Sequence, residues 1–255
     1  MALRARLVIA LALFPFLVAC AAGPNGTAGT STARSTEAAT LASAAPAAPP
    51  AAPAPSPTAT PSATTARSGP TRALFFGDSY IVGGGYTGPH NSMAAVAARR
   101  LGWQAEIRGA GGTGFVSGNP EYGLKSFLGQ IQDGALDVGP VDWLVIEGGG
   151  NDKNDRPGLI QRRAVQVLKA AQKRHPEARI VLVGTMDPTV DDFSDTNGVI
   201  GALARAAART HIPYISAQRW LEGRQDLVGP DYDHPLPAGH RLCGQKLAKA
   251  LRALS

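Results

Sequence analysis

Cysteine is scarce in this chain of 255 residues, which contains only Cys20 and Cys243. Cys20 follows an apolar stretch at the N-terminus, in a context that predicts its chemical modification. With Cys20 modified, no intramolecular disulfide can form. The domain therefore depends on a hydrophobic core, and we expect Cys243 to be a buried packing residue of the last helix.

Long hydrophobic runs are also missing. The apolar stretch at residues 7–19 is shorter than the roughly twenty residues that span a bilayer. Arg4 and Arg6 precede it, so residues 1–19 are predicted to be a secretory signal peptide. The stretch ends in Leu17-Val18-Ala19-Cys20, which resembles a bacterial lipobox and implies lipidation of Cys20. A plain signal peptide that is cut nearby is the alternative.

Large apolar side chains are nearly absent from residues 21–70, where Ala, Pro, Thr, Ser and Gly dominate. Such a segment cannot bury enough surface to offset its ordering entropy. We expect residues 20–70 to be an extended tether, with the lipid on Cys20 holding the chain at the outer face of the cytoplasmic membrane. Residues 71–255 then form one domain with a sizeable core.

Charge of either sign is sparse, and the sequence shows no basic stripe with interleaved aromatic residues. The formal charge of +6 falls by two, to +4, when Arg4 and Arg6 are removed with the signal peptide. This argues against nucleic acid as a partner. We find no internal repeat and no metal-ligand cluster, so we expect neither a metal nor an organic cofactor. We expect a monomer.

The pattern of the domain alternates short β-prone runs with helical periodicity. The predicted strands are residues 72–76, 103–107, 141–147, 179–184 and 213–216, and the predicted helices are residues 91–101, 159–174, 196–210 and 238–254. Three of the strands are apolar on both faces, as in a parallel sheet that is covered on each side. Regular alternation predicts a doubly wound, three-layer α/β/α fold with a mostly parallel five-stranded sheet.

Polar and glycine-rich blocks follow these strands. They are Phe-Gly-Asp-Ser-Tyr at residues 76–80, Gly-Ala-Gly-Gly-Thr-Gly-Phe at 109–115, Gly-Gly-Gly-Asn-Asp at 148–152 and Asp-Tyr-Asp-His-Pro at 231–235. Ligands of open α/β sheets bind at the carboxyl ends of the strands, where the first three blocks lie. The second block lacks the Gly-Lys-Ser/Thr ending of a phosphate-binding loop. The four blocks are therefore predicted to form one site.

These residue types suit acyl transfer. Ser79 is a poor nucleophile without an adjacent base, and His234 can supply that base. An acid must orient the imidazole, and Asp231, three residues earlier, is preferred to the adjacent Asp233. The candidate oxyanion donors are the N–H groups of Ser79 and Gly114 and the side-chain amide of Asn151.

In their order and content the four blocks resemble the SGNH hydrolases, also called GDSL esterases and lipases, over about residues 72–254. The resemblance implies a flavodoxin-like fold with Ser79 as nucleophile, His234 as base, Asp231 as its acid, and Gly114 and Asn151 in the oxyanion hole. Tyr80 stands where leucine is common. Gly109 stands where many members have asparagine, which leaves the choice between Gly112 and Gly114 open.

The sequence thus predicts a secreted, lipid-anchored serine esterase that hydrolyses acyl or acetyl esters. Its location suggests an ester substrate of glycan or lipid type in the cell envelope. One alternative is a glycan O-acyltransferase that uses the same triad. Another is a non-catalytic module that binds the envelope.

Overall fold

A computed structural model describes residues 69–189 and 192–255. The predicted signal peptide, Cys20 and nearly all of the predicted tether lie outside the described residues. The strands are β1 (Arg72–Gly77), β2 (Gln104–Gly109), β3 (Trp143–Gly148), β4 (Arg179–Gly184) and β5 (Tyr214–Ile215). The α-helices are α1 (Ser79–Val82), α2 (Met93–Leu101), α3 (Phe127–Gln132), α4 (Pro157–Arg174), α5 (Ser194–Thr210) and α6 (Pro237–Arg252). Short 3-10 helices are η1 (Pro89–Asn91), η2 (Pro120–Tyr122), η3 (Gly150–Asp152) and η4 (Gln225–Leu227).

The described strands form one parallel sheet in the order β2-β1-β3-β4-β5. The chain adds β2 on one side of β1 and then β3, β4 and β5 on the other side. The switch point between β1 and β3 is where such sheets bind ligands. At the carboxyl end of β1, Gly77 lies opposite Gly109 of β2 and Glu147 of β3. The first three polar blocks therefore meet at one point of the sheet edge.

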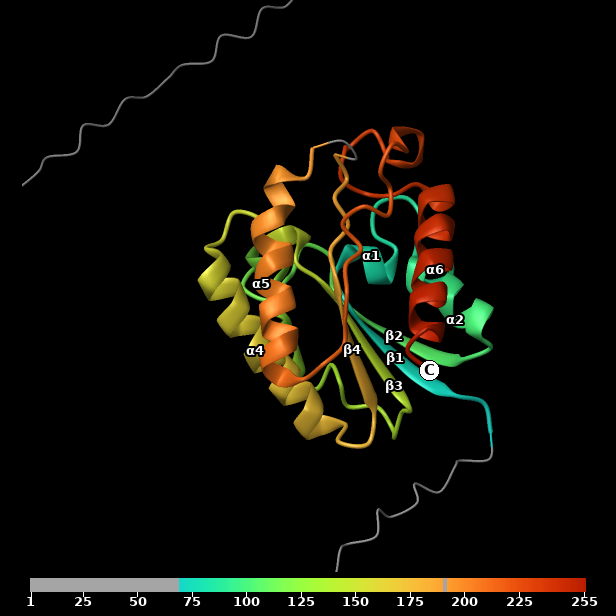
Figure 1. The fold of residues 1–255 in the computed structure, drawn as a ribbon, viewed down its shortest axis with the longest axis vertical. Coiled ribbons are helices and arrows are strands. Elements are labelled where there is room, and N and C mark those ends of the chain that lie inside the picture. The colour runs from blue at the N-terminus through green and yellow to red at the C-terminus, as the bar shows by residue number, and fades with distance from the viewer. Residues whose placement is uncertain (1–68, 190–191) are drawn as a thin grey trace, which may run out of the picture. The chain divides into compact units, whose positions relative to one another are not determined.

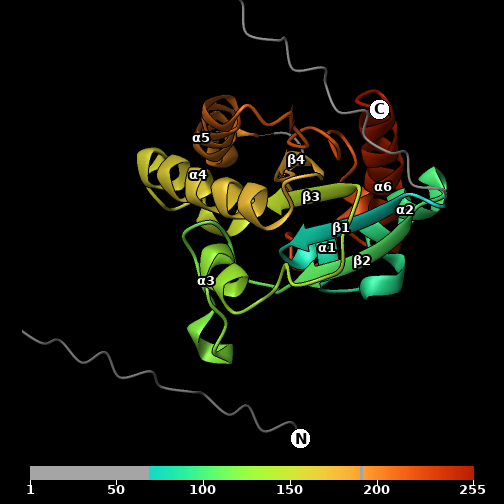
Figure 2. The same cartoon turned by 90° about the horizontal axis from the view of Figure 1, so that it is seen from below.

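Helices cover both faces of the sheet (Figures 1 and 2). Helices α2 and α6 pack on one face, with side chains such as Phe75 and Val145 beneath them. Helices α4 and α5 pack on the other face, over Phe76 and Ile146, and α3 adds Phe127 to the same cluster. Because successive strand residues point to opposite faces and both faces are covered, the central strands are apolar along most of their length, with the buried Glu147 as the exception in β3. The doubly wound fold that the sequence predicted is confirmed.

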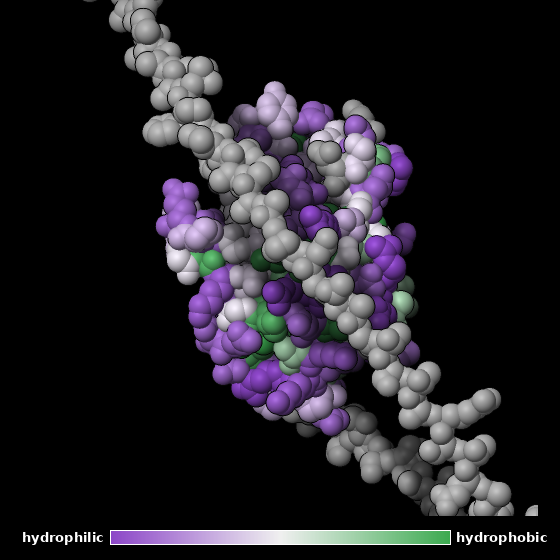
Figure 3. All heavy atoms as spheres, turned by 90° about the vertical axis from the view of Figure 1, so that its left-hand side faces the viewer, coloured by the Kyte–Doolittle hydropathy of each residue, from purple (hydrophilic) through white to green (hydrophobic). Residues whose placement is uncertain are grey.

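The helices are amphipathic, as this packing requires. In α4 the buried residues are Ile160, Ala164, Val167, Leu168 and Ala171. The outward face of α4 and α5 is largely hydrophilic, with only scattered hydrophobic side chains (Figure 3). None of the helices in the described part of the chain is long and apolar enough to cross a membrane.

The predicted elements agree with the observed ones to within two residues at each end, and two observed α-helices were not predicted. The helix expected from residue 91 begins at Met93, because Ser92 is the N-cap and its hydroxyl accepts the N–H of Ala95. Helices α1 and α3 were not predicted, since segments of four and six residues are too short to show a helical period. Cys243 is fully buried in α6, as expected.

Candidate active site

Ser79 is the first residue of α1, directly after the carboxyl end of β1. The side chain of Asp78 caps this helix by accepting the N–H of Tyr80 at 3.0 Å. Gly83 ends the helix in the left-handed conformation, and its N–H is bonded to the carbonyl of Ser79. Ser79 is thus held on a tight turn between two caps, with 8% of its surface exposed.

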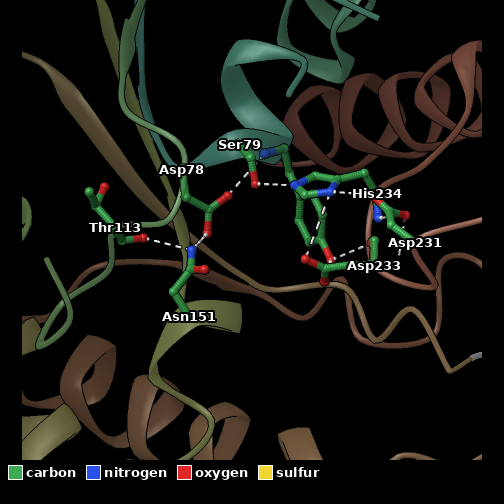
Figure 4. Close-up of polar contacts among 8 residues, drawn as sticks. Asp78, Ser79, Thr113, Asn151, Asp231, Asp233 and His234 are labelled. Carbon is green, nitrogen blue, oxygen red and sulfur yellow. Dashed lines mark hydrogen bonds and ion pairs between the residues drawn. The ribbon is translucent and has the colours of Figure 1, made fainter. Parts of the chain in front are cut away.

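His234 reaches Ser79 from the loop before α6 (Figure 4). Its Nε2 lies 3.0 Å from the Ser79 hydroxyl, and its Nδ1 lies 2.8 Å from Oδ2 of Asp231. The other Asp231 oxygen accepts the backbone N–H of His234 at 3.1 Å. The structure therefore brings the three predicted residues together in a continuous chain of hydrogen bonds.

Asp233 does not occupy the position of the orienting acid. Its carboxylate is 3.8 Å from His234 Nδ1, one ångström farther than that of Asp231. Instead, Asp233 takes part in holding the loop: the buried Tyr80 hydroxyl donates to its backbone carbonyl at 3.0 Å and lies 3.4 Å from its carboxylate. The Tyr80 ring also meets the His234 ring edge to face. Tyr80 thereby ties the nucleophile's helix to the histidine loop.

A glycine segment that the sequence analysis did not single out closes over Ser79 and His234. A β-carbon at Gly84 would lie 2.6 Å from the β-carbon of Ser79, and one at Gly85 would lie 2.7 Å from that of His234. Gly85 also has a φ of +80°, which disfavours other residues. Only glycine permits the backbone to approach both side chains this closely.

The predicted oxyanion role of Gly114 does not fit the structure. Its N–H donates to the carbonyl of Ser117 at 2.8 Å and is not free for a substrate. Glycine is required there for another reason, because a β-carbon would lie 2.5 Å from the Asp152 carboxylate. A β-carbon at Gly111 would lie 3.5 Å from that of Ser79, and neither the N–H of Gly111 nor that of Gly112 has a hydrogen-bond partner in the described residues. These two N–H groups are the better candidates from this block.

Asn151 lies beside Asp78, and its side-chain amide donates to the carbonyl of Thr113 at 2.9 Å (Figure 4). Its second contact, 3.4 Å to Oδ2 of Asp78, is long. The amide hydrogen of Asn151 that faces Asp78 is therefore available to a substrate oxygen, because a hydrogen bond of that length is weak and costs little to give up. Asn151 therefore bridges the first and second blocks and keeps one donor at the cleft.

Asp152 shapes the second block and does not face the nucleophile. It is fully buried, and its carboxylate accepts the N–H groups of Phe115, Val116 and Ser117 at 2.8 to 3.1 Å. Burial raises the pKa of Asp152, and these hydrogen bonds oppose the rise. Asp152 therefore fixes the loop that carries the glycines, which is a structural task.

Asp78 and Asp231 differ in their electrostatics. Burial raises the pKa of Asp78 to about 7, although its hydrogen bond from Tyr80 lowers it. Burial also disfavours ionisation of Asp231, but hydrogen bonds from the His234 ring and from backbone N–H groups prevail and lower its pKa to about 2. Asp231 is thus ionised at neutral pH, as a group that stabilises an imidazolium must be.

The cleft at this site is small and polar. It has a volume of about 180 Å³, and its walls come from all but the second block: Asp78, Ser79, Tyr80, Gly150, Asn151, Lys153, Asn154 and Asp233. A larger hollow of about 380 Å³ between α2 and β2 contains none of the predicted site residues. In residues 69–189 and 192–255, no three His, Cys, Asp or Glu side chains are arranged to hold a metal ion.

A doubly wound sheet with this constellation at its carboxyl edge is the architecture of the SGNH esterases. The chain belongs to the GDSL-like lipase/acylhydrolase family, whose family model matches residues 75–242. It is therefore an ester-hydrolysing enzyme.

Relatives agree with this assignment. A GDSL lipase of Mycobacterium tuberculosis is 28% identical over 187 residues, which cover 68% of this chain and 78% of the relative. Two solved structures share the fold with a TM-score of 0.55: an inhibitor-bound aryl esterase of M. smegmatis and a carbohydrate acetylesterase of Sinorhizobium meliloti. They are 17% and 16% identical, respectively, and each match covers 72% of this chain and all of the other. A family 2 carbohydrate esterase of Myceliophthora fergusii has a TM-score of 0.59 at 23% identity, covering 75% of this chain and 68% of that one.

Proposed function

We propose that the enzyme hydrolyses short acyl esters through an acyl-enzyme intermediate on Ser79. The observation that carries the proposal is the unbroken hydrogen-bond chain from Ser79 through His234 to Asp231. His234 Nε2 takes the hydroxyl proton as Ser79 Oγ attacks the ester carbonyl, and the ionised Asp231 stabilises the imidazolium. The oxyanion is bound by the N–H of Ser79 with donors from Gly111 or Gly112 and Asn151.

The remaining steps use the same residues. The imidazolium of His234 gives its proton to the leaving alkoxide, and the alcohol departs while the acyl group stays on Ser79. A water molecule then loses its proton to His234 and attacks the acyl carbonyl. Collapse of the second tetrahedral intermediate releases the carboxylic acid and returns the proton to Ser79 Oγ.

A short acyl group on a polar alcohol is the substrate class that fits this cleft best. A cleft of about 180 Å³ is smaller than the usual ligand pocket of roughly 300 Å³ or more. Its lining of carboxylates, amides and one lysine offers hydrogen bonds and no apolar channel for a long chain. We propose acetyl esters of glycans, and the fold shared with a carbohydrate acetylesterase supports this choice.

We also propose that the enzyme acts outside the cytoplasmic membrane, anchored by a lipid on Cys20. The support is the basic and apolar N-terminal segment that ends in the lipobox-like sequence. Replacing Cys20 with serine should move the enzyme from the membrane fraction to the soluble fraction while leaving esterase activity unchanged. Membrane association that persists in this variant would contradict lipid anchoring.

A panel of esters tests the proposed activity. The panel runs from p-nitrophenyl acetate to the palmitate and includes acetylated xylan and peptidoglycan. Wild-type enzyme should prefer acetyl esters, and Ser79→Ala should lower kcat by about 10⁴-fold or more. Circular dichroism checks that the variant is folded. Turnover that survives in a folded Ser79→Ala variant would refute the proposal.

A further inference from the structure

Two buried acids near Ser79, Asp78 and Glu147, take no part in the proposed mechanism. Glu147 is the penultimate residue of β3 and has 0% of its surface exposed, while Asp78 has 1%. The two residues are adjacent in space, because Gly77 pairs with Glu147 across the parallel strands and Asp78 follows Gly77. A fully buried glutamate at the centre of a parallel sheet is costly unless it is neutral or paired.

No basic group pairs with these acids. None of the ion pairs of the described residues involves Asp78 or Glu147. No N–H or hydroxyl in the same part of the chain donates to either Glu147 oxygen. The carboxyl that acts on Glu147 is that of Asp78, which follows the residue opposite Glu147 in the neighbouring strand. Two carboxyls can share a hydrogen bond only when one of them keeps its proton.

The contacts of Asp78 decide which acid is ionised. Its oxygens accept the N–H of Tyr80 at 3.0 Å and lie 3.4 Å from the amide of Asn151. Both donors favour a carboxylate at Asp78, whereas Glu147 receives no donor. The proton of the pair therefore belongs on Glu147, with the negative charge on Asp78.

We propose that Glu147 is a positioning residue: its carboxylic acid donates to Asp78 and so fixes the carboxylate that caps the helix of Ser79 and contacts Asn151. One proton and one negative charge are shared by the pair in the active enzyme. Loss of the proton would place two charges in a dry site and push the carboxylates apart. Asp78 would then shift, and with it the nucleophile and an oxyanion donor.

The surroundings make this loss of the proton unfavourable. Burial raises the pKa of Glu147 well above its usual range, and the charge of Asp78 raises it further. The acidic groups near the pair are Tyr80 of α1, Cys243 of α6, Asp152 of η3 and Asp233 of the histidine loop, and none of them favours a second negative charge. Two lysines are also near: Lys153 lines the cleft with Asp78, and Lys246 of α6 acts on Cys243 and donates to the carbonyl of Trp220. Neither lysine forms an ion pair with Asp78 or Glu147 in the described residues.

Infrared spectroscopy tests the location of the proton without reference to activity. Above the pKa of Asp78, which is about 7, that residue is ionised. At about one to two pH units above this value, wild-type enzyme should show the carbonyl band of a protonated carboxylic acid, and Glu147→Gln should lack that band. Glu177→Gln, which replaces an exposed glutamate, should keep it. A band of equal size in wild type and Glu147→Gln, or no band in wild type, would overturn the inference.

Kinetics test the positioning role, and this arm rests on the proposed function. Glutamine can donate to Asp78 at every pH, so Glu147→Gln should keep kcat within about threefold of wild type at pH 7. The ratio of its kcat/KM to that of wild type should rise as pH becomes alkaline, because only the wild-type pair can lose its proton. Glu147→Leu cannot donate and should lose about tenfold or more in kcat with little change in KM.

The outcomes separate this inference from the proposed function. Parallel pH profiles for wild type and Glu147→Gln would overturn the positioning role even if Ser79→Ala is inactive. Conversely, an active Ser79→Ala variant would refute the proposed function and leave the infrared result standing. If Glu147→Leu fails to fold, the infrared and pH comparisons of Glu147→Gln still decide the question.

Discussion

Asp231 and Asp78 both contact residues around Ser79, and their surroundings differ. Asp231 lies in an exposed loop, with 36% of its side chain accessible, and is held by the ring and the backbone of His234. Asp78 lies under the nucleophile, almost without exposure, against a second carboxyl. The same side chain is thus an ionised partner of an imidazole in one place and half of a proton-sharing pair in the other. Environment, and not residue type, sets the task of each acid.

Replacing Asp231, the exposed aspartate, is expected to lower kcat more than any other change that distinguishes the two regions. Asp231→Asn keeps the shape of the loop but removes the charge that stabilises the imidazolium of His234. We expect kcat to fall by about 10³- to 10⁴-fold, as measured in steady-state ester hydrolysis. Asp233→Asn is the matched control and should change kcat by less than about threefold. Equal losses in the two variants would remove the distinction between Asp231 and Asp233.

The link between the two regions is Tyr80, and its loss should have a smaller effect. Tyr80→Phe keeps the ring that packs against His234 and deletes the hydroxyl that donates to the carbonyl of Asp233. One hydrogen bond of this kind contributes about 0.5–1.5 kcal/mol, so kcat should fall about two- to tenfold. A value equal to wild type would show that the histidine loop keeps its position without this contact.

The smallest effect concerns stability, and it has opposite signs for the two aspartates. The pKa of Asp78 is raised in the folded state. Its contribution to the free energy of unfolding is therefore complete below its unfolded pKa and is lost as pH rises through about 7. The pKa of Asp231 is lowered, so its contribution is present above its unfolded pKa and is lost as pH falls through about 2.

Thermal unfolding across this pH range checks both signs. The melting temperature should fall by several degrees between pH 5 and 8, and Asp78→Asn should flatten that part of the curve. On the acid side, Asp231→Asn should flatten the fall below pH 4 only slightly, because the group is partly exposed and screened by solvent. A melting temperature that rises steadily from pH 5 to 8 would contradict the raised pKa of Asp78.

The two regions also differ in how well the sequence predicts them. The triad could be read from the chain, because Ser79, His234 and Asp231 stand in short blocks with distinctive spacing. The fold followed from strands that are apolar on both faces. The role of Glu147 carries no such pattern, since a single acid at the end of a predicted strand is an ordinary residue until the neighbouring strand is known.

The oxyanion donors fall between these cases. The glycine-rich block was found, but the choice of Gly114 depended on where its N–H points. That direction is set by the turn to Ser117 and by the packing of Asp152 against the glycine. The turn joins residues three apart, but Asp152 lies more than thirty residues from this block. The local sequence therefore does not show that Asp152 packs against this glycine.

Direct capture of the acyl-enzyme tests the central claim most sharply. Wild-type enzyme mixed with excess p-nitrophenyl acetate and quenched in acid should gain one acetyl group, which peptide mapping should locate on Ser79. His234→Ala should acquire the group far more slowly, and Ser79→Ala should acquire none at the site. Acetylation of another residue, or rapid turnover by wild type without any acetyl group on Ser79, would contradict the account.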